Sequence, residues 1–162
     1  MERYQRLLFP PMLGGGAAVG LLILRVVVGF AFVQHGYPKI QHPASWMTLA
    51  MGPRAFAPAW LQAIVAAVEF GGGIALMLGL LTPLAALLLA CDMIGAMLTV
   101  ELPSGAAFVG GRHSYELNAV YVAVMAALLF VGPGFVSVDR WLGGAVRRAQ
   151  DVRGAGRPTH WR

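Results

Sequence analysis

Four apolar runs, separated by polar or glycine- and proline-rich segments, set the pattern of this chain. They cover about residues 17–36, 59–81, 83–102 and 115–131. A run of roughly 20 residues, at a rise of 1.5 Å per residue, matches the hydrocarbon thickness of a bilayer. We therefore predict an all-α integral membrane protein, with a bundle of four spanning helices inside residues 17–136.

The segments between the runs predict where the chain turns. Pro38 is expected to end the first helix, because proline lacks the N–H group that a helix interior needs. A polar and aromatic connector over residues 37–59 follows, with a short helix over 44–51. Residues 81–83 leave room only for a very short turn, so the second and third helices should form an antiparallel hairpin. A glycine-rich loop over 103–114 leads to the fourth helix.

Composition and charge agree with a membrane protein. Of the 162 residues, 58% are hydrophobic and 12% are charged, whereas charged residues make up about a quarter of an ordinary soluble domain. The net charge of +5 comes from arginines that flank the bundle, in a lead-in over residues 1–16 and in a tail over residues 137–162. By the positive-inside rule, both termini should be cytoplasmic and should meet lipid headgroups rather than nucleic acid. We expect a multi-pass protein of a bacterial-type inner membrane.

Three of the runs each carry one charged residue near the middle: Arg25, Glu69 and Asp92. A charge at the bilayer centre is costly, so each should face protein and find a counter-charge. At 1.5 Å per residue all three fall within about a turn of the midplane. We therefore predict a buried ion cluster of these three residues. It is either a structural clasp that fixes which helix faces which, or a protonatable site that relays protons or binds a polar headgroup.

A second polar set gathers toward the outer ends of the helices. It could line an outward-facing pocket, because histidine titrates near physiological pH and lysine or arginine attracts an acidic ligand. The alternative is a set of ordinary interfacial residues whose polar heads stay in water. The members of this set are His35, Lys39, Glu101, Arg112, His113 and Glu116.

Redox and metal motifs do not occur in the sequence. Cys91 is the single cysteine, so a disulfide or a CxxC pair within one chain is excluded. No HxxxH, CxxCH or HExxH spacing occurs, so we predict no metal or haem site. The first apolar run is longer than the core of a signal peptide and lacks a small-residue cleavage site, so we expect it to remain as an anchor.

Four passages resemble the DoxX family of small four-helix membrane proteins. They are LLILRVVVGFAFVQHGYPKI from Leu21, VEFGGGIALMLGLLTPLAALLLACDMIGAMLTVELP from Val68, SYELNAVY from Ser114 and GPGFVSVDRWL from Gly132. The resemblance covers about residues 20–142 and implies a four-helix membrane protein linked to membrane redox, because the family takes its name from a subunit of a thiosulfate:quinone oxidoreductase. It implies a quinone as cofactor class, although the chain has no cofactor motif of its own. The residues that match the polar pattern of the family are Arg25, His35, Gly36, Lys39, Glu69 and Glu116.

Three functions remain open at this point. The first is a membrane subunit of a quinone-linked oxidoreductase complex that is not catalytic on its own and works with other membrane-protein subunits. The second is a structural or assembly subunit, since glycine-rich spans suit close packing in a larger membrane complex. The third is a small-molecule or proton carrier, which ranks last because the sequence lacks the inverted repeats of transporters.

Overall fold

A computed structural model describes residues 14–52, 55–110 and 114–142 of the chain. Within these ranges the fold is all-α, as predicted, and the only β-pairing is an isolated bridge between Ala107 and Ser114. Residues 138–142 form a further helical turn. The named helices, in chain order, are α2 (Gly15–Gln41), α3 (Trp46–Met51), α4 (Ala59–Leu78), α5 (Thr82–Ala96), its π-helical continuation η2 (Met97–Glu101) and α6 (Glu116–Val131).

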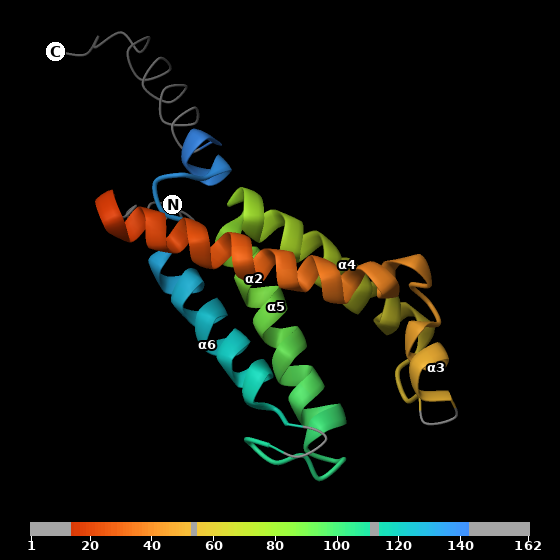
Figure 1. The fold of residues 1–162 in the computed structure, drawn as a ribbon. Coiled ribbons are helices and arrows are strands. Elements are labelled where there is room, and N and C mark those ends of the chain that lie inside the picture. The colour runs from red at the N-terminus through yellow and green to blue at the C-terminus, as the bar shows by residue number, and fades with distance from the viewer. Residues whose placement is uncertain (1–13, 53–54, 111–113, 143–162) are drawn as a thin grey trace, which may run out of the picture.

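The long helices form two pairs. Helix α2 packs along α4, and α5 packs along α6, while a smaller contact joins α4 to α5 (Figure 1). The two pairs meet near the tight turn between α4 and α5 and diverge toward α3 and the loop that follows η2 (Figure 1).

Glycines determine how α2 and α4 face each other. A Cβ atom built on Gly29 would lie 2.6 Å from the backbone oxygen of Gly73, and one built on Gly36 would lie 2.5 Å from the backbone nitrogen of Phe70. No side chain fits at either position, so the two backbones approach as closely as small residues allow in membrane helix pairs. The register is therefore fixed, with Gly29 opposite Gly73 and Gly36 opposite Phe70.

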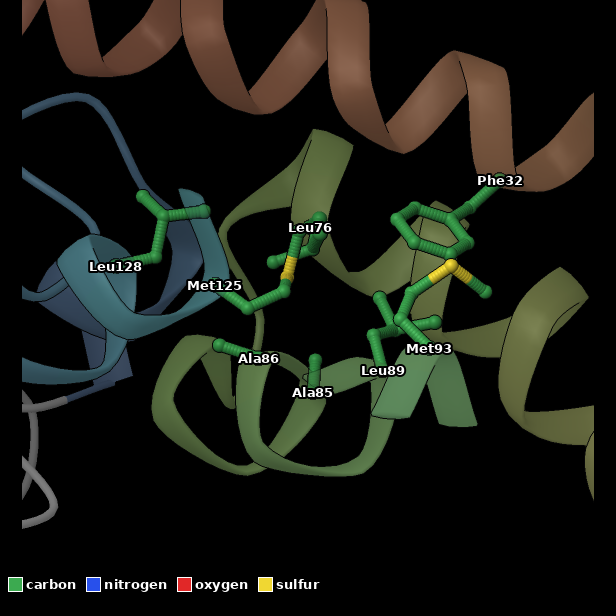
Figure 2. Close-up of a cluster of buried hydrophobic side chains, with 8 residues drawn as sticks. All are labelled: Phe32, Leu76, Ala85, Ala86, Leu89, Met93, Met125 and Leu128. Carbon is green, nitrogen blue, oxygen red and sulfur yellow. The ribbon is translucent and has the colours of Figure 1, made fainter. Parts of the chain in front are cut away.

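The apolar core lies where the two pairs cross. Figure 2 shows side chains from α2, α4, α5 and α6 meeting there, with the Met93 sulfur close to the Phe32 ring. Phe32 also packs against Tyr121, with 4.9 Å between the ring centroids. Sulfur–aromatic and aromatic–aromatic contacts add to the packing of this region. The buried members of the core are Phe32, Leu76, Ala85, Ala86, Leu89, Met93, Met125 and Leu128.

The prediction that Pro38 ends the first helix is wrong. Helix α2 continues through Pro38 to Gln41. A proline within a helix removes one backbone hydrogen bond and crowds the preceding turn. Here only three helical residues follow it, so little of the helix is affected. The extra turn matters because it carries Lys39 across to α4.

The other predicted elements are confirmed within a few residues. The connector contains a short helix, α3, and the turn before α5 is tight, with Gly79 at φ +66° and Leu81 at φ +46°. Three helices are long and apolar enough to cross a membrane, namely α2, α4 and the continuous Thr82–Glu101 segment of α5 and η2. Helix α6 is apolar but shorter. The described residues therefore provide three helices, and a shorter fourth, that are apolar enough to be candidates for membrane spans.

Candidate functional site

A cavity of about 350 Å³ lies between α4 and the continuous helix formed by α5 and η2, with α3 contributing to one end. Most of its wall is apolar. Four strongly polar side chains reach it from three helices: Lys39 from α2, Gln62 and Glu69 from α4, and Asp92 from α5. Apolar walls with a few convergent polar groups are typical of sites for small organic ligands.

Lys39 and Glu69 form the ion pair of this site. The Lys39 Nζ lies 2.5 Å from Glu69 Oε1, and the two side chains are 24% and 4% exposed. The ammonium group also lies 4.4 Å from the centroid of the Trp46 ring, an arrangement that favours a cation by its interaction with the π-face. Lys39 is therefore held between a buried carboxylate and an aromatic ring.

Asp92 completes a group of two acids and one base. It lines the same cavity as Glu69 and lies close enough for the two carboxyl groups to interact electrostatically. Glu69 Oε2 and Asp92 Oδ2 are buried and have no hydrogen-bond partner within the described part of the chain. A buried acceptor without a donor costs about 1–3 kcal/mol. One proton between the two carboxyl groups, or a ligand that donates hydrogen bonds, would satisfy these atoms.

Gln62 fastens α3 over the end of the cavity. Its Oε1 accepts a hydrogen bond from the Met47 backbone N–H at 2.9 Å, and its Nε2 donates to the Ala57 carbonyl at 2.8 Å. The Trp46 indole N–H donates to the Gln62 backbone oxygen at 2.9 Å. Gln62 and Trp46 thus position the aromatic ring that faces Lys39. In the sequence, Gln62 could be noticed only as a single amide side chain two helical turns before Glu69, on the same face of α4.

The π-helical segment η2 also contributes to the wall, through Thr99 and Val100. Segments of π-helix are rare and occur frequently at functional sites. Here the wider turn follows directly after Gly95 and Ala96, which line the same cavity. The irregularity of the helix therefore coincides with the cavity.

The predicted pairing of Arg25 with Glu69 and Asp92 is wrong. No salt bridge joins Arg25 to either acid among the described residues. Its guanidinium instead donates to the Val136 backbone oxygen and lies against Gly79. The reason is the register that the glycines impose on α2 and α4. Arg25 lies one helical turn before Gly29, and at that point α2 is already level with the loop at the end of α4. Glu69 pairs instead with Lys39, from the part of α2 that follows Pro38, and Asp92 lines the same cavity.

Asp139 explains how Arg25 is accommodated, and sequence reasoning assigned it no role. Its Oδ1 and Oδ2 accept hydrogen bonds from the Leu81 and Thr82 backbone N–H groups at 2.6 and 2.8 Å, which caps the start of α5. Its own N–H donates to the Gly79 carbonyl at 2.9 Å. The carboxylate is also close enough to Arg25 for a favourable charge interaction. Arg25 and Asp139 thus fasten residues 136–142 to the end of the bundle.

The predicted outer pocket is distributed differently. Of its described members, only Lys39 lines the cavity. His35 and Glu116 are exposed, and Glu101 is half-buried just after the wall formed by η2. Arg112 and His113, like the lead-in up to residue 13 and the tail from residue 143, lie outside the described residues. No group of three His, Cys, Asp or Glu side chains is placed to hold a metal ion in the described ranges.

Comparison with known proteins identifies relatives of the chain. The model of the DoxX family matches residues 20–102. The Bacillus subtilis protein named "Putative oxidoreductase CatD" is 31% identical over 75% of this chain and 85% of its own length. The Mycobacterium tuberculosis "Uncharacterized membrane protein Rv3486" is 29% identical over 83% of this chain and 88% of its own length. The Escherichia coli "Inner membrane protein YqjF" is 31% identical over 76% of this chain and 92% of its own length. No solved structure matches the chain.

Proposed function

Because the chain belongs to the DoxX family of membrane proteins, we propose that it is a quinone-binding subunit of a membrane oxidoreductase complex, not catalytic on its own. The observation that carries this proposal is the apolar cavity between α4 and α5 with Lys39, Glu69 and Asp92 in its wall. One relative named as an oxidoreductase supports the redox part of the proposal. Electrons would pass to and from partner chains.

The chemistry of the three charged residues suits both redox forms of a quinone. The carbonyl oxygens of a quinone accept hydrogen bonds, and the Lys39 ammonium is a donor. The hydroxyl groups of a quinol donate, and the unpaired oxygens of Glu69 and Asp92 are acceptors. The Trp46 ring also lines the cavity and lies beside Lys39, so it can contact a bound quinone ring.

The proposed topology follows from helix lengths and flanking charges. We place four spans in a bacterial inner membrane, with α6 as the shortest, and both termini on the cytoplasmic side because arginines flank the bundle. The Gly79 turn and Asp139 then lie at the cytoplasmic end. The outer end carries α3 and the opening of the space between the helix pairs, so the cavity lies in the outer half of the bundle.

Quinone binding can be measured by the fluorescence of Trp46. The chain has four tryptophans, and Trp60, Trp141 and Trp161 are replaced by phenylalanine so that Trp46 reports alone. Decylubiquinone is titrated into nanodiscs that contain this variant. We expect a saturable quenching component in addition to the linear collisional one. Its absence would refute the proposed function.

A cavity-filling variant with a matched control links the signal to the site. Gly95 lines the cavity, and a Cβ atom at Gly95 meets nothing within 4 Å, so Gly95→Leu should fill the space without disturbing the fold. Gly71 is equally unobstructed but exposed away from the cavity, so Gly71→Leu serves as the control. We expect the saturable component to be lost in Gly95→Leu and kept in Gly71→Leu.

Membership of a redox complex needs a separate measurement. The chain is purified in mild detergent from its native membrane, and the proteins and quinone that accompany it are identified. A redox partner together with bound quinone supports the proposal. A large complex without quinone, unchanged by Glu69→Gln and Asp92→Asn, would instead identify a purely structural subunit.

A further inference from the structure

The cavity is open on a side that a membrane would cover. Five residues that line it are also exposed: Phe56 in the connector, Ile64 on α4, Leu88 and Cys91 on α5, and Thr99 on η2. Three of them lie on α4 and α5 themselves, with Ile64 at 52%, Leu88 at 43% and Cys91 also exposed. Helices α4 and α5 diverge from each other away from the turn that joins them (Figure 1). Both helices are long and apolar enough to span a bilayer, and Ile64, Leu88 and Cys91 are well inside their ends. This mouth, defined by Ile64, Leu88 and Cys91, therefore faces hydrocarbon.

The polar end of the cavity is set back from this mouth. Glu69 and Gln62 are each 3% exposed, and the free oxygens of Glu69 and Asp92 are buried. The rest of the lining is mostly apolar and includes Val65 and Val68. An occupant that fits this gradient has a hydrogen-bonding head and an apolar extension.

We propose that the ligand is an amphipathic molecule that enters laterally from the bilayer, with its polar ring beside Lys39, Glu69 and Asp92 and its apolar tail leaving through the mouth between α4 and α5. This inference rests on the proposed function and adds the direction of entry and the need for a tail. The tail exchanges one apolar environment for another, so moving it costs little. The head gains donors and acceptors that hydrocarbon does not offer.

Narrowing the mouth tests this placement. Cys91→Phe adds a bulky ring at the exposed edge of the cavity, and Leu87→Phe places the same ring on the neighbouring exposed position of α5 outside the cavity. Two quinones are compared in the Trp46 assay: decylubiquinone, which has a tail, and duroquinone, which has none. Thermal unfolding of both variants checks that the fold is retained.

The expected result is selective for the tailed ligand. The added ring occupies the space through which the tail would leave, so Cys91→Phe should weaken decylubiquinone binding roughly tenfold, which corresponds to about 1.4 kcal/mol. It should leave duroquinone binding close to wild type, and Leu87→Phe should affect neither. If Cys91→Phe weakens both quinones equally, or neither, the tail does not leave through this mouth and the inference is wrong while quinone binding stands. If wild type binds neither quinone saturably, the proposed function fails and this inference with it.

Discussion

Replacing Lys39 with methionine isolates the central ion pair of the cavity. Methionine keeps most of the apolar length of the lysine side chain, so the change removes the charge and little packing. It leaves Glu69, whose side chain is only 4% exposed, without the cation that lies 2.5 Å from it in the wild type. Removing one partner of a buried pair costs about 3–5 kcal/mol. Because Lys39 itself is 24% exposed, the lower end of this range, about 3 kcal/mol, is the expected loss.

The matching double variant makes this prediction specific. Removing both charges of a buried pair is often nearly neutral, so Lys39→Met with Glu69→Gln should recover most of the stability lost in Lys39→Met alone. Wild type and both variants are heated in nanodiscs, and the fraction of protein that stays monodisperse is measured at each temperature. The Tm values obtained in this way are compared. For a chain of this size, about 3 kcal/mol corresponds to a lowering of Tm by roughly 6–12 °C. A Tm for Lys39→Met equal to wild type, or a double variant as unstable as the single one, would refute the pairing.

Substitutions at three further sites, with Gly71→Ala as a control, test other parts of the structure by the same unfolding assay. Gly29→Ala should destabilise by about 1–3 kcal/mol because its Cβ would meet the α4 backbone, whereas Gly71→Ala, in open space on a helix, should stabilise by up to about 1 kcal/mol. Gln62→Leu should cost about 1–3 kcal/mol because a buried N–H of α3 loses its acceptor, and an unchanged Tm would contradict the role of Gln62 in holding α3. Asp139→Ala should cost about 1–2 kcal/mol through loss of the α5 cap, and adding Glu69→Gln should not change that loss, since the two sites are at different ends of the bundle.

The helices could be predicted from the sequence because the pattern that indicates them involves only neighbouring residues. Apolar runs of spanning length, a short turn at residues 81–83 and a polar connector with a short helix all reflect composition over neighbouring residues, and the structure confirms them. The end of α2 was missed at Pro38, because a proline near a helix terminus removes one hydrogen bond without stopping the helix.

The pairing of charges was harder because it depends on register between helices. Depth along each run suggested that Arg25 would meet Glu69 and Asp92. With the close contacts at Gly29 and Gly36, Lys39 rather than Arg25 reaches Glu69. The sequence indicated only that glycine-rich spans suit close packing, and it did not state which residue of α4 each glycine of α2 faces.

The role of Asp139 could not be obtained from periodicity at all. It lies beyond the last long helix, and its partners are backbone N–H groups more than fifty residues earlier in the chain. The cavity itself results from the divergence of two helix pairs, which no local pattern encodes. Gln62 is the intermediate case, since it stood on the polar face of α4 but its partners in α3 were not predictable.

The most direct test of the account is the location of a bound quinone. An azido derivative of decylubiquinone is photolysed in nanodiscs that contain the wild-type chain, and the modified residues are identified by mass spectrometry. We predict modification within residues 61–69 and 88–100, the α4 and α5–η2 walls of the cavity, and its disappearance with excess decylubiquinone or in Gly95→Leu. Modification spread over the lipid-facing surfaces of α2 and α6, and unaffected by either treatment, would contradict the assignment of this cavity as the quinone site.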